Sequence, residues 1–375
     1  MQLAALSTVS NRIQLGAPLP FNVRDADRTL LLARGQSVDS AEQMEALFRR
    51  GALVDMAELL SAHETIMQAP REQLPKLWTQ CLQRVGQALL ASPRVGFRIA
   101  LDEAAGPVMS LIDRDPDLAI FQILRKTGNA DLAYGTQRSL HTAITASLVA
   151  HRLAWSEDET QRAFKAGLTA NLSMLQLQGE LSHQALPPSP EQHHALQTHP
   201  MRSVQMLQTA GIEDEDWLQA VLDHHEVEGG GGYPAGKSDV GAMASLIRRA
   251  DIYTAKLAGR SHRNALAADV AGRQMFMQDP GHPMTAALVK EFGLYPPGCH
   301  VRLASGALAI VVQRGARVDS PIVACLTNER GAPLPQPLRV DTADKRHAVA
   351  GLVGEKSVNV SVTAERLMAL GVVAG

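Results

Sequence analysis

The chain has 375 residues and a formal net charge of −2, from 36 Lys and Arg against 38 Asp and Glu. This length allows two or three domains, each with its own hydrophobic core. Because the sequence pI is near 6.7, the chain lacks a basic footprint, and a nucleic acid polymer is not expected as a partner. The sequence shows no apolar run of the ~20 residues that a membrane helix needs and no signal-peptide pattern, so we expect no membrane span and a cytoplasmic location.

The three cysteines, Cys81, Cys299 and Cys325, are widely spaced and odd in number. They predict neither a disulfide framework nor a zinc knuckle. We expect them to be small buried hydrophobic residues in a reducing compartment.

Residues 1–60 are expected to form a small β-rich module. Between Gly16 and Ser40, two short apolar runs flank the turn Asp25-Ala26-Asp27, as in a hairpin. Ser40 then precedes a short amphipathic helix that closes at Gly51. The residues leave open whether this module senses a ligand, receives a partner or covers the helical core.

Residues 61–115 predict a helical connector, and residues 116–292 predict a helical domain in which Ser156 and Glu159 form a capping box. Residues 293–375 carry alternating apolar runs with glycine turns, which predict a short antiparallel β-rich tail. The connector has one apolar stripe, typical of a core or a homodimer seam: Leu74, Leu77, Trp78, Cys81, Leu82 and Val85. The predicted fold class is therefore mostly α, with a small β-rich module at each end.

The segment from His224 to Pro234 reads His-His-Glu-Val-Glu-Gly-Gly-Gly-Gly-Tyr-Pro and has the composition of a binding site. Two adjacent imidazoles can ligate a transition metal or orient a phosphate. Consecutive glycines let the backbone approach a ligand closely, and the tyrosine offers a ring for stacking. The competing interpretation is a helix that ends in a flexible glycine loop and happens to carry two histidines.

This segment resembles the signature of the HD-GYP family, helical phosphohydrolases that open cyclic di-GMP with a two- or three-metal centre. The family pattern, His-His-Glu followed by Asp-Gly-x-Gly-Tyr-Pro, is matched through Glu226 and again from Gly230, with Gly229 in place of the aspartate. Three further segments resemble the family in the same order: residues 198–211, 247–263 and 295–312. The resemblance covers about half of the chain and implies a helical HD-type bundle.

The resemblance also implies functional residues. The residual metal ligands would be His199, His224, His225 and Asp251. The ligand- or partner-binding residues would be Gly230, Gly232, Tyr233, Pro234, Lys237 and Arg260. Two structural alternatives stay open: His199, before Pro200, could cap a helix start, and Asp251 could pair with Arg248, Arg249 or Lys256.

The residues that give the family its name are replaced in this chain. The His-Asp dipeptide falls at Ala170-Asn171, the lysine that follows it at Met174, and an earlier family histidine at Arg138. His141, one helical turn after Arg138, is a poor substitute. Alanine has no ligand atom, an asparagine amide is a weak neutral ligand, and arginine carries a fixed positive charge. We therefore expect no catalytic residue, no bimetallic centre and no required cofactor, and at most one divalent iron or manganese ion.

Three functions remain open at this stage. We favour a degenerate HD-GYP signalling protein of a bacterial type, which binds a cyclic dinucleotide, a signalling protein or both without hydrolysis. The alternatives are an active metal-dependent cyclic di-GMP phosphodiesterase with an atypical site and a non-catalytic scaffold. The missing bridging carboxylate argues against the enzyme, and the loop Gly232-Tyr233-Pro234 argues against the scaffold. We also expect Gly229–Gly232 to be mobile, since glycines offer no side chain for packing.

Overall fold

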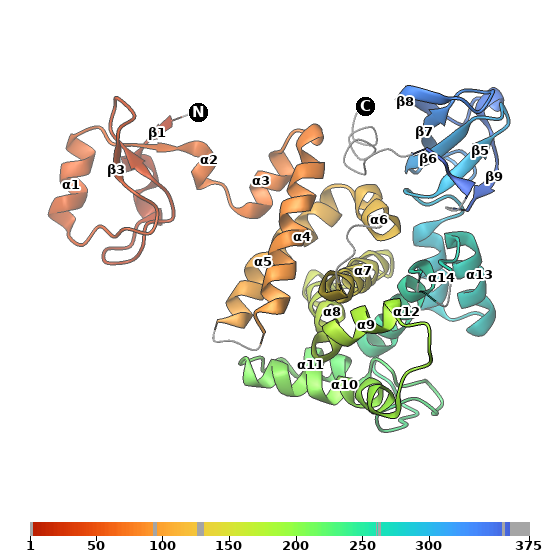
Figure 1. Ribbon diagram of the computed structural model, residues 1–375. Helices are drawn as coiled ribbons and strands as arrows, with labels where there is room; N and C mark the ends of the chain where they lie inside the picture. Colours follow the sequence, from red (N-terminus) through yellow and green to blue (C-terminus); the bar gives the residue numbers. More distant parts are fainter. Residues whose placement is uncertain are drawn as a thin grey trace. The chain divides into compact units, whose positions relative to one another are not determined.

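The computed structural model describes residues 3–92, 96–125, 131–259, 261, 264–354 and 357–360, with the backbone alone at residues 57 and 131–133. The chain folds into two compact units, Met1–Ala69 and Pro70–Gly375 (Figure 1). Each unit is described by itself below.

The first unit is a small antiparallel sheet with short helices. The strand order is β1-β4-β2-β3, and its elements are β1 (Leu3–Ala5), η1 (Leu6–Arg12), β2 (Val23–Arg24), β3 (Leu30–Leu32), α1 (Ala41–Arg49), β4 (Leu53–Asp55), α2 (Met56–Leu59) and α3 (Ala62–Gln68). Strands β2 and β3 pair as the predicted hairpin. The Ser40 side chain accepts a hydrogen bond from the Gln43 backbone and so caps α1, as expected. Phe21 and Val54 lie in its buried core.

The second unit is mainly helical. Its helices are η2 (Arg71–Gln73), α4 (Leu74–Leu90), α5 (Phe97–Arg114), α6 (Pro116–Leu124), α7 (Asp131–Arg152), α8 (Glu157–Thr169), η3 (Leu172–Met174), α9 (Leu175–His183), α10 (Pro190–Thr209), α11 (Glu215–Asp223), α12 (Ala242–Leu257), α13 (Ala268–Gln278) and α14 (Pro283–Phe292). The apolar stripe of α4 is core, because Trp78, Cys81 and Val85 are buried and α4 packs on α5. The predicted capping box of Ser156 and Glu159 is present at the start of α8.

Helix α7 lies at the centre of the second unit and packs against α8, α9 and α12. Two of its contacts require glycine. A Cβ atom at Gly135 would lie 2.1 Å from the Leu175 carbonyl oxygen, and one at Gly167 would lie 3.1 Å from the Cα of Ala143. A Cβ atom essentially never makes the first contact, and the second is tighter than most real ones, so the two glycines allow α8 and α9 to lie directly against α7.

A second antiparallel sheet follows α14, in the strand order β8-β7-β6-β5-β9. Its elements are β5 (His300–Leu303), β6 (Leu308–Gln313), β7 (Ile322–Thr327), β8 (Pro333–Asp341), η4 (Lys345–His347) and β9 (Val349–Val353). The predicted mostly helical fold class with a small antiparallel sheet at the C-terminal end is confirmed. Among the residues described, no helix combines the length and apolar character needed to cross a bilayer.

Arg314 connects this sheet to the helices through ion pairs. Arg314, after β6, forms ion pairs with Asp117 of α6 and Glu291 of α14, and Glu291 also pairs with Arg152 at the end of α7. The two carboxylates are largely buried, with 15% and 9% of their side chains exposed. A buried carboxylate is costly without its cation.

We expect Arg314→Gln to lower the free energy of unfolding by about 3 kcal/mol, because it leaves two buried carboxylates short of a cation. Urea unfolding followed by circular dichroism would measure the change. The matched control is Arg317→Gln, since Arg317 pairs with Asp319 on the exposed surface of the same loop and its loss should change little. Equal effects of both substitutions would show that Arg314 does not bind the sheet to the helices.

Candidate functional site

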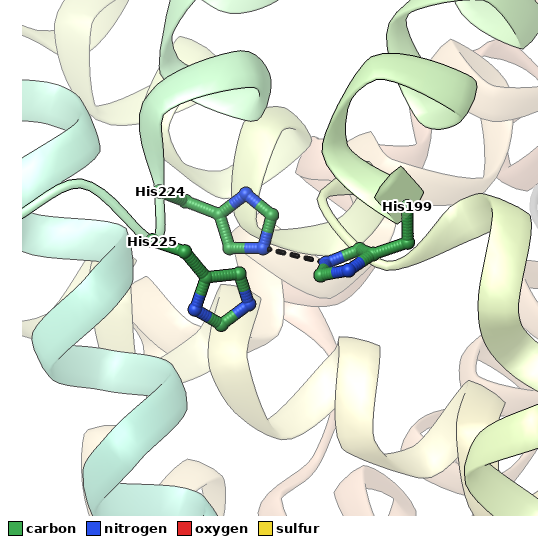
Figure 2. A group of neighbouring side chains, drawn as sticks. All are labelled: His199, His224 and His225. Carbon is green, nitrogen blue, oxygen red and sulfur yellow. Dashed lines mark hydrogen bonds between the residues drawn. The ribbon is translucent and has the colours of Figure 1, made fainter. Parts of the chain in front are cut away.

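Three histidines from two helices meet in the second unit (Figure 2). His199 lies within α10, His224 ends α11, and His225 follows directly. One ring nitrogen of each lies within 4.8 Å of the others, and Nε2 of His199 is 3.1 Å from Nε2 of His224. The structure thus brings together three of the four predicted metal ligands.

Two backbone carbonyls orient two of these rings. Because Pro200 has no N–H, the Leu196 carbonyl of α10 lacks its normal helical donor, and Nδ1 of His199 donates to it at 2.6 Å. The alternative in which His199 caps a helix start is therefore wrong, since His199 lies inside the helix.

The ring of His224 is also oriented by a hydrogen bond to a backbone carbonyl, at the end of a helix. The Val221 carbonyl belongs to the last turn of α11, where carbonyls have no helical donor, and Nδ1 of His224 donates to it at 2.6 Å. With both Nδ1 atoms committed as donors, both Nε2 atoms present lone pairs at one point. Outer hydrogen bonds of this kind fix the tautomer and orientation of metal-binding histidines.

Burial keeps these rings neutral. It lowers the pKa of His199 to about 3 and also lowers the pKa of His224 and His225. Neutral imidazole is the form that ligates metals. Nε2 of His225 is buried and has no hydrogen-bond partner among the described residues, while the ring stacks on Tyr233 with centroids 4.5 Å apart. A buried nitrogen without a partner is uncommon, and a metal ion would satisfy it.

The donor set therefore fits one transition metal ion. Two nitrogens that each lie about 2.1 Å from one ion are roughly 3.0 to 3.4 Å apart, and the separation of the two Nε2 atoms is 3.1 Å. When bound, such an ion would supply a Lewis acid that attracts an anionic ligand.

Asp251, the fourth predicted ligand, is not a member of this group. Nη2 of Arg138 donates to its carboxylate at 2.7 Å and to its backbone carbonyl at 3.0 Å, and Oγ1 of Thr142 lies 3.3 Å from the same carboxylate. Arg138 is thus the partner of Asp251. Arg248, Arg249 and Lys256, the three cations considered from the sequence, do not pair with it in the described residues. Arg249 instead binds Glu228 and Asp279, and Lys256 donates to Gln274.

Ala170 and Asn171 occupy the turn between α8 and η3, and both are fully buried. In the described part of the chain, neither amide atom of Asn171 has a hydrogen-bond partner. Met174, next to them, is also buried. The segment expected to hold the dipeptide thus offers one neutral amide and two apolar side chains.

The glycine loop is fixed by a carboxylate. Glu226, which is buried, accepts hydrogen bonds from three successive backbone amides, those of Ala235, Gly236 and Lys237, at 2.6 to 3.1 Å. A Cβ atom at Gly232 would lie 2.4 Å from the Cα of Glu226, so the backbone passes directly over that residue. The three amides lie directly after the four glycines and Tyr233-Pro234, so Glu226 holds the end of the loop, and the expected mobility of Gly229–Gly232 stays a prediction.

Three glycines of the loop, Gly229, Gly230 and Gly231, have φ between 87° and 99°, which L-residues rarely adopt. The peptide bond between Tyr233 and Pro234 is cis. The Tyr233 amide donates to the His225 carbonyl at 3.3 Å. The loop therefore turns back and places the tyrosine ring on His225.

Of the predicted binding residues, Lys237 is already engaged, since its Nζ lies 2.8 Å from the Asp223 carboxylate. Arg260 lies outside the described residues. Sequence reasoning did not consider Asp223 as a partner for Lys237 or Glu226 as an anchor for the loop. The adjacency of Asp223 and Glu226 to the two histidines was the available signal for both.

Arg248 on α12 is a further residue near the site. In the described part of the chain it has no hydrogen-bond or ion-pair partner, and it is half-buried. Its positive charge helps to lower the pKa of His225, after burial and the two other histidines. Among the described residues, its guanidinium thus makes no hydrogen bond or ion pair and acts on the histidines through its charge.

Two cavities lie nearby. One of about 320 Å³ lies between α8, α11 and the start of α12, and its walls include Trp155, Arg162 and Asp223. The other, of about 260 Å³, shares Arg162 and includes Lys165 and Trp217. The histidines line neither cavity, so the chemistry of the site rests on the side chains described above.

Comparison with known proteins agrees with this geometry. The family model for the HD domain matches residues 127–278. Over 260 residues the chain is 25% identical to the cyclic di-GMP phosphodiesterase PA4108 of Pseudomonas aeruginosa, covering 68% of this chain and 60% of that protein. The solved structure of Bd1817, an HDGYP protein from Bdellovibrio bacteriovorus, is similar with a TM-score of 0.50 and 15% identity, covering 77% of this chain and 98% of that chain.

The similarity to the Bd1817 structure concerns the fold alone, and the chain spans about three fifths of the length of the Pseudomonas protein. The HD-domain match includes the three histidines, the glycine loop and helix α12. Residues 127–278 match the HD domain, and the relative and the loop motif support an HD-GYP family member.

Proposed function

We propose that this protein binds a cyclic dinucleotide without hydrolysing it, at a site built on one ion held by His199, His224 and His225. The observation that carries the proposal is the composition of the site: three imidazoles converge, while Arg138 holds the Asp251 carboxylate. A signalling protein that contacts the glycine loop is a compatible partner.

Two-metal hydrolysis needs closely spaced ions that hold both the attacking and the leaving oxygen. A bridging carboxylate supports such a pair, and Asn171 has only a neutral amide at the position expected for it. Binding a phosphodiester without hydrolysing it does not require a second ion, because one ion and positively charged donors suffice to hold it.

Three features support a nucleotide as the ligand. The relative PA4108 is named a cyclic di-GMP phosphodiesterase. Arg248 has no partner among the described residues and would be free to donate to a phosphate. The loop holds the Tyr233 ring, itself half-buried, beside the histidines, and an aromatic ring can stack on a base.

Our first prediction concerns metal content. Protein purified without chelators should contain at most one transition metal ion per chain, and His224→Ala should abolish binding because it removes one of three ligands. The combined change Arg138→His, Ala170→His and Asn171→Asp should raise the occupancy above one. Elemental analysis returning two ions per wild-type chain, lost together in His224→Ala, would contradict the single-ion site.

The second prediction concerns the nucleotide. Cyclic di-GMP should bind in calorimetry but show no turnover by chromatography, with manganese, iron or zinc supplied. Arg248→Ala should weaken binding on the order of tenfold or more, the effect of losing a charge-assisted hydrogen bond. The control is Arg273→Ala on the exposed face of α13, which should bind as wild type does. Metal-dependent hydrolysis by the unmodified chain would establish the enzyme instead.

The third prediction concerns the loop that presents Tyr233. Glu226→Gln removes the charge that three amides share, so exchange of the amide hydrogens of Ala235, Gly236 and Lys237 should accelerate about 10- to 100-fold. Hydrogen-exchange mass spectrometry would measure it, with the exposed Glu213→Gln as control. If exchange in the wild type is already as fast as in the variant, the carboxylate does not hold the loop.

A further inference from the structure

Helix α12, which carries Asp251, packs against α11, the helix that His224 follows, but the Asp251 carboxylate is not a member of the three-histidine group. The negative charge of Asp251 raises the pKa of His199 and His224 against the larger lowering by burial, so it acts on both rings. Its oxygen is nevertheless bound by Arg138 at 2.7 Å. A potential oxygen ligand is thus present beside the site and already engaged.

An incoming ion would have to displace the guanidinium to reach Asp251. Arg138 has 3% of its side chain exposed and also donates to the Asp251 backbone carbonyl. A guanidinium cannot lose its proton in a protein, and a buried cation separated from its carboxylate costs several kcal/mol. The ion pair therefore keeps the Asp251 carboxylate engaged.

With Asp251 engaged by Arg138, the site offers an ion the neutral ring nitrogens of three histidines. Imidazole suits zinc, copper and nickel, and iron as well, whereas carboxylate oxygens suit manganese and magnesium. Three histidines with an open fourth position are a known zinc arrangement. Because none of the three donors is charged, the ion keeps its full positive charge for an anionic ligand.

We propose that Arg138 sets the metal preference of this site: by occupying the Asp251 carboxylate, it leaves three imidazole donors and makes the site bind zinc-class ions in preference to manganese. This inference rests on the part of the proposed function in which the histidines bind one ion. It departs from the iron or manganese expected from the family resemblance.

The test is metal binding by the full chain, stripped of metal and titrated with Zn²⁺, Mn²⁺ and, anaerobically, Fe²⁺ against a competing chelator. Cobalt(II) serves as a spectroscopic probe, since four-coordinate cobalt absorbs visible light far more strongly than six-coordinate cobalt. The wild type should bind one zinc ion, bind manganese far more weakly, and give the intense cobalt spectrum.

Arg138→Gln frees the Asp251 carboxylate. We expect it to raise manganese affinity on the order of tenfold, the scale on which partners of metal ligands act, and to raise zinc affinity less. The double variant Arg138→Gln/Asp251→Asn removes both charges and should return manganese affinity to the wild-type value. Arg273→Gln, which breaks an exposed arginine–carboxylate pair on α13, should change neither affinity.

Arg138→Lys keeps a cation beside Asp251 and should retain the wild-type preference, which provides a test if Arg138→Gln does not fold. Equal manganese affinities in the wild type and Arg138→Gln, or a gain that persists in the double variant, would overturn the role of Arg138. Absence of any bound ion in the wild type would overturn this inference and the single-ion site together, whereas cyclic di-GMP binding is measured separately.

Discussion

The candidate site depends on two hydrogen bonds from imidazoles to backbone carbonyls. In each case the carbonyl is available because the helix cannot use it: Pro200 removes the donor in α10, and α11 ends after Val221. Side-chain identity alone would leave each ring free to rotate and to exchange tautomers. The helix geometry instead directs the Nε2 lone pairs of His199 and His224 toward each other. The capacity of the site to hold one ion follows from this arrangement.

Much of this arrangement is visible in the sequence. The histidine pair, the glycines and Tyr233 lie together in one segment, and helix caps such as Ser156 with Glu159 are local signals that the structure reproduces. Local patterns can be read because the residues that form them are neighbours in the chain. The mostly helical class and the antiparallel strands after Pro297 follow from the same periodicities.

The long-range pairing could not be predicted in this way. Arg138 and Asp251 are 113 positions apart, and three nearer cations competed for the aspartate in any local reasoning. Only the packing of α12 on α7 decides between them. The loop shows the same limit, because the glycine composition does not indicate that the Glu226 carboxylate accepts hydrogen bonds from the backbone amides that follow Pro234.

The ion pairs around Glu291 have a practical consequence for dissecting this protein. The HD-domain match ends at residue 278, which suggests a convenient place to cut the chain. A fragment that stops before β5 would lose Arg314, leaving Asp117 with no cation and Glu291 with Arg152 alone. Arg152 ends the same helix that carries Arg138. Truncation between helices and sheet would therefore disturb α7, so properties of an isolated helical fragment would not represent the site in the whole chain.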